Sequence, residues 1–173
     1  MPNVDTVLGA NRTAVHELIA AAEASESAWT TPTAPEKWSP SQLVEHVARC
    51  LEESANVVAG RSSAFPTLPF FLRPVIRAVF FRKVLRKKAF PKSKTMKPLD
   101  PASGSASAAD GKRRLLTALA GFEEECRSKA ASGQAVVSSV FGAVSVEEYG
   151  EFQALHTRHH CDQIRQAHPS VTH

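Results

Sequence analysis

The sequence lacks most of the motifs that mark nucleotide-dependent enzymes and common proteases. Neither glycine-rich phosphate loop is present, whether GxxxxGK followed by Ser or Thr or GxGxxG, and there is no GxSxG or HExxH motif. ATP hydrolysis, dinucleotide binding and a zincin protease therefore lose support. No base-reading motif is present, and the chain has one tyrosine for stacking on bases, so we expect no nucleic-acid partner.

Long hydrophobic runs are also absent. The most apolar stretch, residues 69–81, is interrupted by Arg73 and Arg77, and it is too short and too charged to span a bilayer. The first residues lack the basic start and apolar core of a signal peptide. The three cysteines are widely spaced, odd in number and without a C-x-x-C pair, which is typical of reduced thiols. We therefore expect a cytoplasmic protein.

The length and composition favour one folded domain. Of the 173 residues, 43% are apolar and 22% are charged, which excludes both a polytopic membrane protein and a fully disordered chain. A chain of this size buries roughly 70% of its unfolded surface, so it needs no metal or disulfide merely to fold. No unit recurs at a solenoid-like period. We predict a single domain over residues 1–173.

The net charge of +4 hides a strong asymmetry. Ten basic residues and no acidic residue lie between Arg73 and Lys97, whereas the remainder carries 11 basic and 17 acidic residues, a net of −6. This basic segment has three interpretations: a solvated face or the anion-attracting rim of a pocket, a surface that contacts an anionic membrane, or a phosphate-binding surface. The first interpretation is the most common one for a run of charges.

Helical periodicity dominates the rest of the sequence. Apolar residues that recur every three or four positions predict four long helices, over residues 5–27, 39–60, 110–129 and 145–168. Two helix starts carry capping boxes, Ser39 with Gln42 and Ser145 with Glu148, and Pro40 suits the first helical position. Four long helices of this kind predict an all-α, up-and-down four-helix bundle.

The connections are less regular. Residues 70–90 predict an extra basic amphipathic helix with a bend near Pro74, and residues 91–109 predict a long, mobile surface loop between the second and third core helices. Between residues 131 and 145, Val136-Val137 and Val140-Phe141 are candidates for short extended segments.

Three histidines stand at positions that suit a metal site. His156 and His160 are four residues apart, so they share one face of the last helix. His46 lies on the apolar face of the second helix, which a bundle would bring against the last one. Catalytic zinc commonly has three protein ligands and one open position. The alternative is that these histidines are hydrogen-bonded core residues.

Other reactive side chains have plainer interpretations. Cys50, four residues after His46, is either a zinc-binding thiolate, a redox or transfer thiol, or a small core residue. Glu53 lies on the same stripe as a potential hydrogen-bond acceptor or general base, or as a solvated charge. His159 points away from His160 and is therefore expected to be exposed, His16 is expected at the surface, and His168 and His173 lie at the end of the chain.

The segment from Trp38 to His46, WSPSQLVEH, resembles the W-S-x-x-x-x-x-x-H start of the second helix in the DinB/YfiT-like superfamily. The stretch from Phe141 to Tyr149 and the basic segment are similar to those of a branch of that superfamily whose activity is unknown. The resemblance extends from about Val7 to Ile164 and implies a four-helix bundle. It also implies a divalent metal held by His46, His156 and His160.

The resemblance implies several activities without selecting one. Members include metal-dependent hydrolases and thiol-dependent S-transferases or isomerases, so we expect a zinc or nickel enzyme that acts on a small molecule. The alternative is a non-catalytic bundle whose basic segment docks on an anionic membrane or an acidic partner. Flat apolar faces also favour a homodimer. The catalytic residues and the general base stay unassigned.

Overall fold

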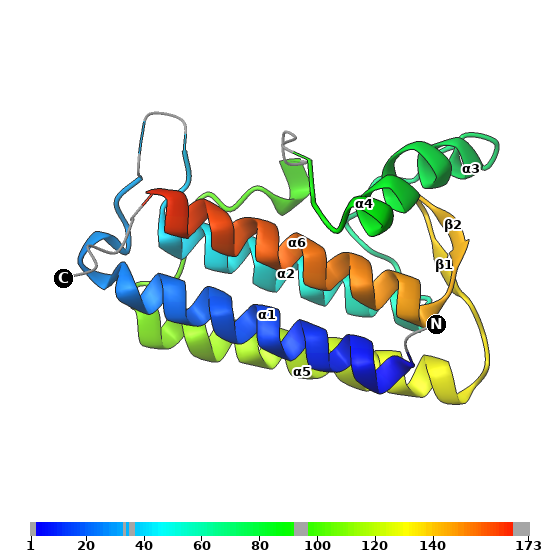
Figure 1. Ribbon diagram of the computed structural model, residues 1–173, viewed down its shortest axis with the longest axis horizontal. Helices are drawn as coiled ribbons and strands as arrows, with labels where there is room; N and C mark the ends of the chain where they lie inside the picture. The colour runs from blue at the N-terminus through cyan, green and yellow to red at the C-terminus, as the bar shows by residue number, and fades with distance from the viewer. Residues whose placement is uncertain (1–2, 33, 35–36, 92–96, 168–173) are drawn as a thin grey trace.

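Four long helices form a bundle in the computed structural model, as predicted (Figure 1). The structure describes residues 3–32, 34, 37–91 and 97–167. The long helices are α1 (Val4–Ala24), α2 (Pro40–Ala59), α5 (Ala108–Ala131) and α6 (Val146–Ala167). A short 3-10 turn, η1 (Glu26–Ala28), follows α1. His168, Pro169 and His173, and residues 92–96 of the predicted loop, lie outside the described residues.

Local hydrogen bonds explain where these helices begin and end. The capping box of α2 is present: Ser39 Oγ accepts from the Gln42 amide, and the Gln42 side chain accepts from the Ser39 amide. Ser145 and Glu148 make the matching pair of bonds at α6. Gly60 ends α2 in the left-handed conformation at φ 77°, which glycine adopts without strain. Both predicted capping boxes are therefore confirmed.

The helices do not follow a simple up-and-down order. α1 packs mainly on α6, and α2 packs mainly on α5. Near the start of both α2 and α5, the α5 residue Gly111 lies against Val44; near their other ends, Arg61 pairs with Glu125. These two contacts show that α2 and α5 run parallel. The expectation of alternating directions fails here because residues 60–107 are long enough to return the chain to the first end of the bundle.

The first part of this connection contains the predicted basic helix in a shorter form. One projecting element lies beside α6 (Figure 1). It consists of three consecutive helical segments: α3 (Arg73–Ile76), the π-helical η2 (Arg77–Phe81) and α4 (Arg82–Lys87). Phe81 and Val84 anchor it in the core. The predicted bend at Pro74 is absent, because the helix begins only at Arg73 and leaves no earlier turn to bend.

The second part of the connection is anchored rather than loose. The turn η3 (Lys97–Leu99) buries Leu99, and the side chain of Gln42 donates to the carbonyl oxygen of Pro101. The indole of Trp29 donates to the Ser105 carbonyl oxygen. Gly104 lies so close to Ser41 that a Cβ at this position would collide with the backbone. The expectation of a mobile surface loop is therefore wrong for residues 97–107, because polar contacts and close approach hold them on α2.

A short hairpin connects α5 to α6. Its strands, β1 (Val136–Ser138) and β2 (Gly142–Val144), are antiparallel with Val136 opposite Val144. The first predicted extended segment is confirmed, whereas the second, Val140-Phe141, lies in the turn. The reason is that Ser138 Oγ accepts from the amides of both Val140 and Phe141, which curls the chain before the second strand begins.

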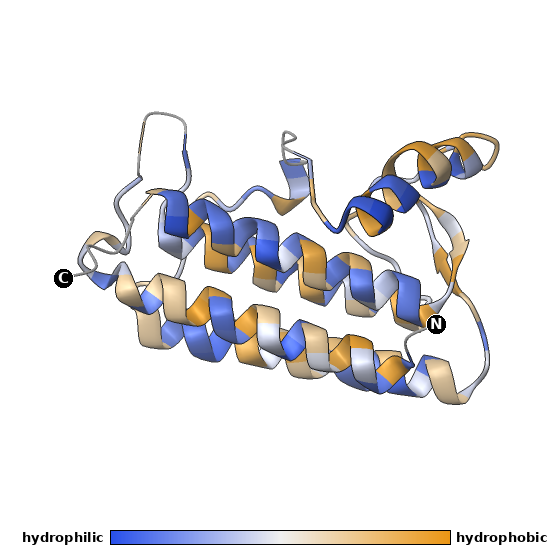
Figure 2. Ribbon diagram, viewed as in Figure 1, coloured by the Kyte–Doolittle hydropathy of each residue, from blue (hydrophilic) through white to orange (hydrophobic). Residues whose placement is uncertain are grey.

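The core lies between the four long helices, whose apolar stripes face inward and whose polar residues face out (Figure 2). Among the described residues, no helix has the length and apolar character needed to cross a membrane. The bundle brings the first half of α2 against the second half of α6, and this is where the histidines meet.

Candidate metal centre

His46 enters the core from the second turn of α2. His46 is only 3% exposed, and its Nδ1 lies 2.8 Å from the carbonyl oxygen of Leu99 in η3. A carbonyl oxygen can only accept a hydrogen bond, so Nδ1 carries the proton. The Nε2 lone pair of His46 therefore remains available on the side of the ring away from Leu99.

His156 and His160 reach the same place from consecutive turns of α6. Their Nε2 atoms lie 3.0 Å apart, and His160 is 5% exposed while His156 is half-buried. The Nδ1 of His160 lies 2.8 Å from Oε1 of Gln163, whose Nε2 donates to Nε2 of His159. Gln163 thus holds the proton of His160 on Nδ1, so the Nε2 of His160 presents a lone pair toward His156 and the shared volume.

The three imidazoles converge on one small volume. The ring centre of His46 is 5.3 Å from that of His156 and 4.7 Å from that of His160. One nitrogen from each ring lies within 4.8 Å of the other two, and among the described residues this is the one group of three or more His, Cys, Asp and Glu side chains so placed. The antiparallel packing of α2 on α6 creates this arrangement.

Burial keeps these imidazoles neutral. Loss of solvation lowers the pKa of His46, while the Leu99 carbonyl oxygen and the nearby Asp100 carboxylate partly offset it. Burial, reinforced by His46, lowers the pKa of His160 to about 3. Burial also lowers the pKa of His156 well below its ordinary value, with His160 and His46 adding to the effect. A neutral imidazole is the protonation state that binds a metal.

Aromatic rings enclose the cluster on two sides. Trp38, directly before the cap of α2, has its ring centre 4.8 Å from that of His46. Phe90, three residues after the end of α4, meets His156 edge-on with a centre-to-centre distance of 5.0 Å. These rings place apolar surface against His46 and His156, and an apolar surrounding strengthens electrostatic interactions.

The donor set fits a divalent transition metal. Two of the three Nε2 atoms are held as lone-pair donors by hydrogen bonds at the opposite nitrogen, which is the usual arrangement around metal-binding histidines. An all-imidazole set suits zinc, nickel or copper and does not suit calcium or magnesium, which prefer oxygen. The geometry is therefore compatible with metal binding.

A comparison with protein families points the same way. The DinB superfamily matches residues 8–164, which is most of the chain and includes all three histidines. The chain belongs to the DinB superfamily. The predicted membership and the all-α bundle are thereby confirmed. Searches of the curated proteins and of the solved structures found no match to this DinB-superfamily chain.

The other candidate side chains take no part in the cluster. Cys50 is buried with its Sγ 3.6 Å from Nε2 of His46, but the sulfur is outside the group of converging donors. Burial raises the pKa of this thiol and so favours its protonated form, in line with the core interpretation. Glu53 accepts from the amide of Ala64 at 2.7 Å and so serves the loop after α2. His159 is half-buried rather than exposed, because its Nε2 accepts from Gln163 and its ring lies near that of Phe90. His16 is exposed, as expected.

Two groups of the site were not predicted from the sequence: the Gln163 side chain and the Leu99 carbonyl oxygen. Gln163 carried a usable signal, because it follows His160 by three residues and thus shares its helix face. The Leu99 carbonyl carried none, since a backbone oxygen from a distant turn leaves no trace in the sequence pattern.

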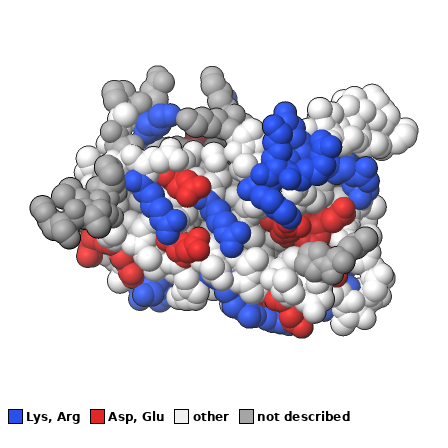
Figure 3. All heavy atoms as spheres, viewed as in Figure 1, with Lys and Arg blue, Asp and Glu red and all other residues white. Residues whose placement is uncertain are grey.

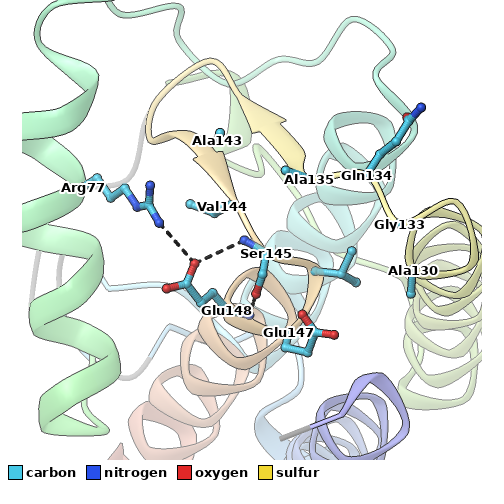
Figure 4. A pocket seen from close by; sticks show the side chains of 11 residues that line it. Arg77, Ala130, Gly133, Gln134, Ala135, Ala143, Val144, Ser145, Glu147 and Glu148 are labelled. Atoms are coloured by element: carbon cyan, nitrogen blue, oxygen red, sulfur yellow. Dashed lines mark hydrogen bonds and ion pairs between the residues drawn. The ribbon is translucent and has the colours of Figure 1, made fainter. Parts of the chain in front are cut away.

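One surface hollow lies away from the histidines. It is at the start of α6, where Arg77 reaches the Glu148 carboxylate and the Glu148 carboxylate accepts from the Ser145 amide (Figure 4). The histidines lie about two turns or more further along α6. This hollow belongs to the helix start and the basic element, and not to the histidine cluster.

The lowered histidine pKa values predict acid sensitivity in the metal-free protein. Between pH 6.5, the ordinary pKa, and about 3, the value for His160, the unfolded chain takes up protons that the folded chain does not. The free energy of unfolding therefore falls as the pH decreases below 6.5, by up to about 1.4 kcal/mol per pH unit for each such histidine. Urea unfolding with a chelator at pH 5 to 8 measures this slope. His160→Gln should reduce it, and an unchanged slope would contradict the assigned burial effect.

The hydrogen bond from His160 to Gln163 predicts a specific loss of metal affinity. Gln163→Ala should weaken metal binding by about 10- to 100-fold, because the imidazole loses the acceptor that fixes its tautomer. Gln163→Glu should retain binding, since a carboxylate also accepts from Nδ1. Gln166→Ala is the matched control, as this exposed glutamine lies one turn away. Competition titration with a chromogenic chelator measures the affinities; equal values for Gln163→Ala and Gln166→Ala would refute the role of Gln163.

Proposed function

We propose that this chain is a metal-dependent enzyme that acts on a small molecule through His46, His156 and His160. The observation that supports this most strongly is the hydrogen bonding at the outer nitrogens. Leu99 and Gln163 hold the protons of His46 and His160 on Nδ1 and turn the Nε2 lone pairs toward the shared volume. Histidines that only filled the core would not need two rings to present their Nε2 lone pairs toward a third ring.

Zinc or nickel is the proposed metal. Both accept imidazole ligands, and three protein donors leave positions for water or substrate. Bound there, the ion supplies Lewis acidity, which lowers the pKa of a water molecule or thiol that contacts it. The protein's own contribution is to present neutral imidazoles, to fix their tautomers and to enclose the site with Trp38 and Phe90.

Two reaction classes fit this site: hydrolysis and thiol-dependent transfer. In either class the chain itself does not provide the nucleophile through Cys50, because burial raises the pKa of that thiol and its sulfur is enclosed in the core. A thiol reaction would therefore use a free, low-molecular-weight thiol. The basic segment is placed to attract an anionic substrate of this kind, such as a thiol that carries a carboxylate.

The test uses two model reactions on the full chain loaded with zinc or nickel. Hydrolysis of p-nitrophenyl acetate and conjugation of glutathione to monochlorobimane are followed with and without chelator. We expect one of them to depend on the metal and to fall on the order of a thousandfold in His156→Ala, the loss expected when several kcal/mol of charge stabilisation disappears. His16→Ala, an exposed histidine on α1, is the control. Rates that are the same with and without metal in both reactions would contradict the proposal.

A further inference from the structure

The projecting element α3–η2–α4 presents one face to solvent that has two chemical halves. Leu72, Val75 and Val79 follow each other at spacings of three and four residues, which places them on one side of the helix. The same side continues with Arg82, Lys83 and Arg86, which are three, four and seven positions after Val79. The opposite side carries Phe81 and Val84, which are fully buried and attach the element to the bundle.

The apolar half is unusually exposed. Val75 is 53% exposed and Val79 is 60% exposed, and the turn that leads into α3 adds Phe70 at 79% and Phe71 at 63%. These residues account for most of the exposed large hydrophobic side chains among the described residues. The hydropathy colouring shows them as an apolar tip that extends away from the four long helices (Figure 2). A contiguous exposed apolar tip of this kind indicates an interaction surface.

The basic half lies directly beside the tip. Figure 3 shows Lys and Arg side chains gathered over α4, next to the uncharged lobe formed by α3. Arg77 and Lys88, at the margins, pair with Glu148 and Glu151 of α6. In the described part of the chain, no carboxylate pairs with the four cations between them, which are all exposed: Arg82, Lys83, Arg86 and Lys87.

We propose that this surface, the docking face, binds the surface of an anionic lipid bilayer. It consists of Phe70, Phe71, Leu72, Val75 and Val79 together with Arg82, Lys83, Arg86 and Lys87. Exposed apolar side chains insert at the boundary of headgroups and acyl chains, and unpaired cations beside them contact anionic headgroups. A bilayer is the partner that uses both halves at once.

Charge disfavours a second copy of the chain as the occupant. A symmetric contact would place the same patch against itself, so four unpaired cations would meet four others without any compensating carboxylate. A nucleic acid would satisfy the cations but would leave the aliphatic residues Leu72, Val75 and Val79 exposed to water. The proposal goes beyond the metal chemistry and does not depend on it.

The docking face is also connected to the histidine cluster. Only residues 88 and 89 lie between the end of α4 and Phe90, whose ring contacts His156. α4 itself packs on α6, the helix that carries His156 and His160. Membrane docking would therefore hold the site close to the lipid surface through a short link.

Vesicle flotation of the full chain tests the proposal. We expect the protein to float with phosphatidylcholine vesicles that contain phosphatidylserine, and much less with vesicles of phosphatidylcholine alone. Salt should weaken this binding. A chelator should leave it unchanged, which separates the docking face from the proposed enzymatic function. Lack of flotation with anionic vesicles at low salt would overturn the proposal.

Three variants locate the binding surface. Replacing the four unpaired cations with glutamate should reduce binding at least about fivefold per cation. Val75→Asp with Val79→Asp should reduce it at least about tenfold, because charged side chains cannot enter the acyl boundary. Lys112→Glu with Arg113→Glu replaces two exposed, ion-paired cations at the start of α5; it is the control for a charge change outside the docking face and should bind as the wild type does. Circular dichroism checks that each variant is folded.

The other occupants give distinct results. Sedimentation that shows a dimer, dissociated by Val75→Asp with Val79→Asp, would assign the apolar half to self-association and overturn the proposal. Tight binding of a single-stranded oligonucleotide that competes with vesicles and needs only the basic half would overturn it in favour of phosphate recognition. Equal loss of flotation in the Lys112 and Arg113 control would show nonspecific charge attraction and would also overturn it.

Discussion

Three imidazole rings in contact within a folded core must each satisfy two ring nitrogens, and this requirement determines much of the surrounding structure. The outer nitrogens of His46 and His160 are satisfied by Leu99 and Gln163. The inner nitrogens face one another, with the Nε2 atoms of His156 and His160 3.0 Å apart. Neutral rings are a condition of this arrangement, because like charges at such distances in a desolvated site are strongly unfavourable. A divalent ion bound between the rings would satisfy all three inner lone pairs together.

The fold meets this requirement with parts that are distant in the sequence. α2 and α6 supply the rings, whereas the carbonyl oxygen of Leu99 comes from the connection between α2 and α5. That connection must return to the start of α2, and it is held there by Gln42, Trp29 and the close approach of Gly104 to Ser41. The parallel course of α2 and α5 is the topological consequence. The first part of the same connection forms the basic element, α3–η2–α4, that projects from the bundle.

The sequence predicts the local features well because short-range chemistry controls them. The capping boxes at Ser39 and Ser145, the four helices, and the shared face of His156 and His160 all follow from spacings of three or four residues. The prediction that His46 joins His156 and His160 needs one further assumption, that the second helix packs against the last one. The extent of the domain and its compartment remain predictions.

Features that depend on tertiary packing could not be predicted in this way. The direction of α5 depends on contacts made by residues 97–107, such as the bond from Gln42 to the Pro101 carbonyl oxygen and the close approach of Gly104 to Ser41, and neither contact follows from helical periodicity. The same holds for the Leu99 carbonyl oxygen at His46. The turn position of Val140 depends on one hydroxyl, Ser138 Oγ, which an alternation of apolar residues does not reveal. In each case the deciding group is a backbone atom or a single polar contact.

The metal content of the purified protein tests the central claim most directly. Untagged protein that has never met a chelator is analysed by inductively coupled plasma mass spectrometry beside His156→Ala and the exposed-histidine control His16→Ala. The account predicts about one equivalent of zinc or nickel per chain in the wild type and the control, and its loss in His156→Ala. A wild-type protein that holds no metal and takes up none on titration would contradict it, and the three histidines would then be core residues.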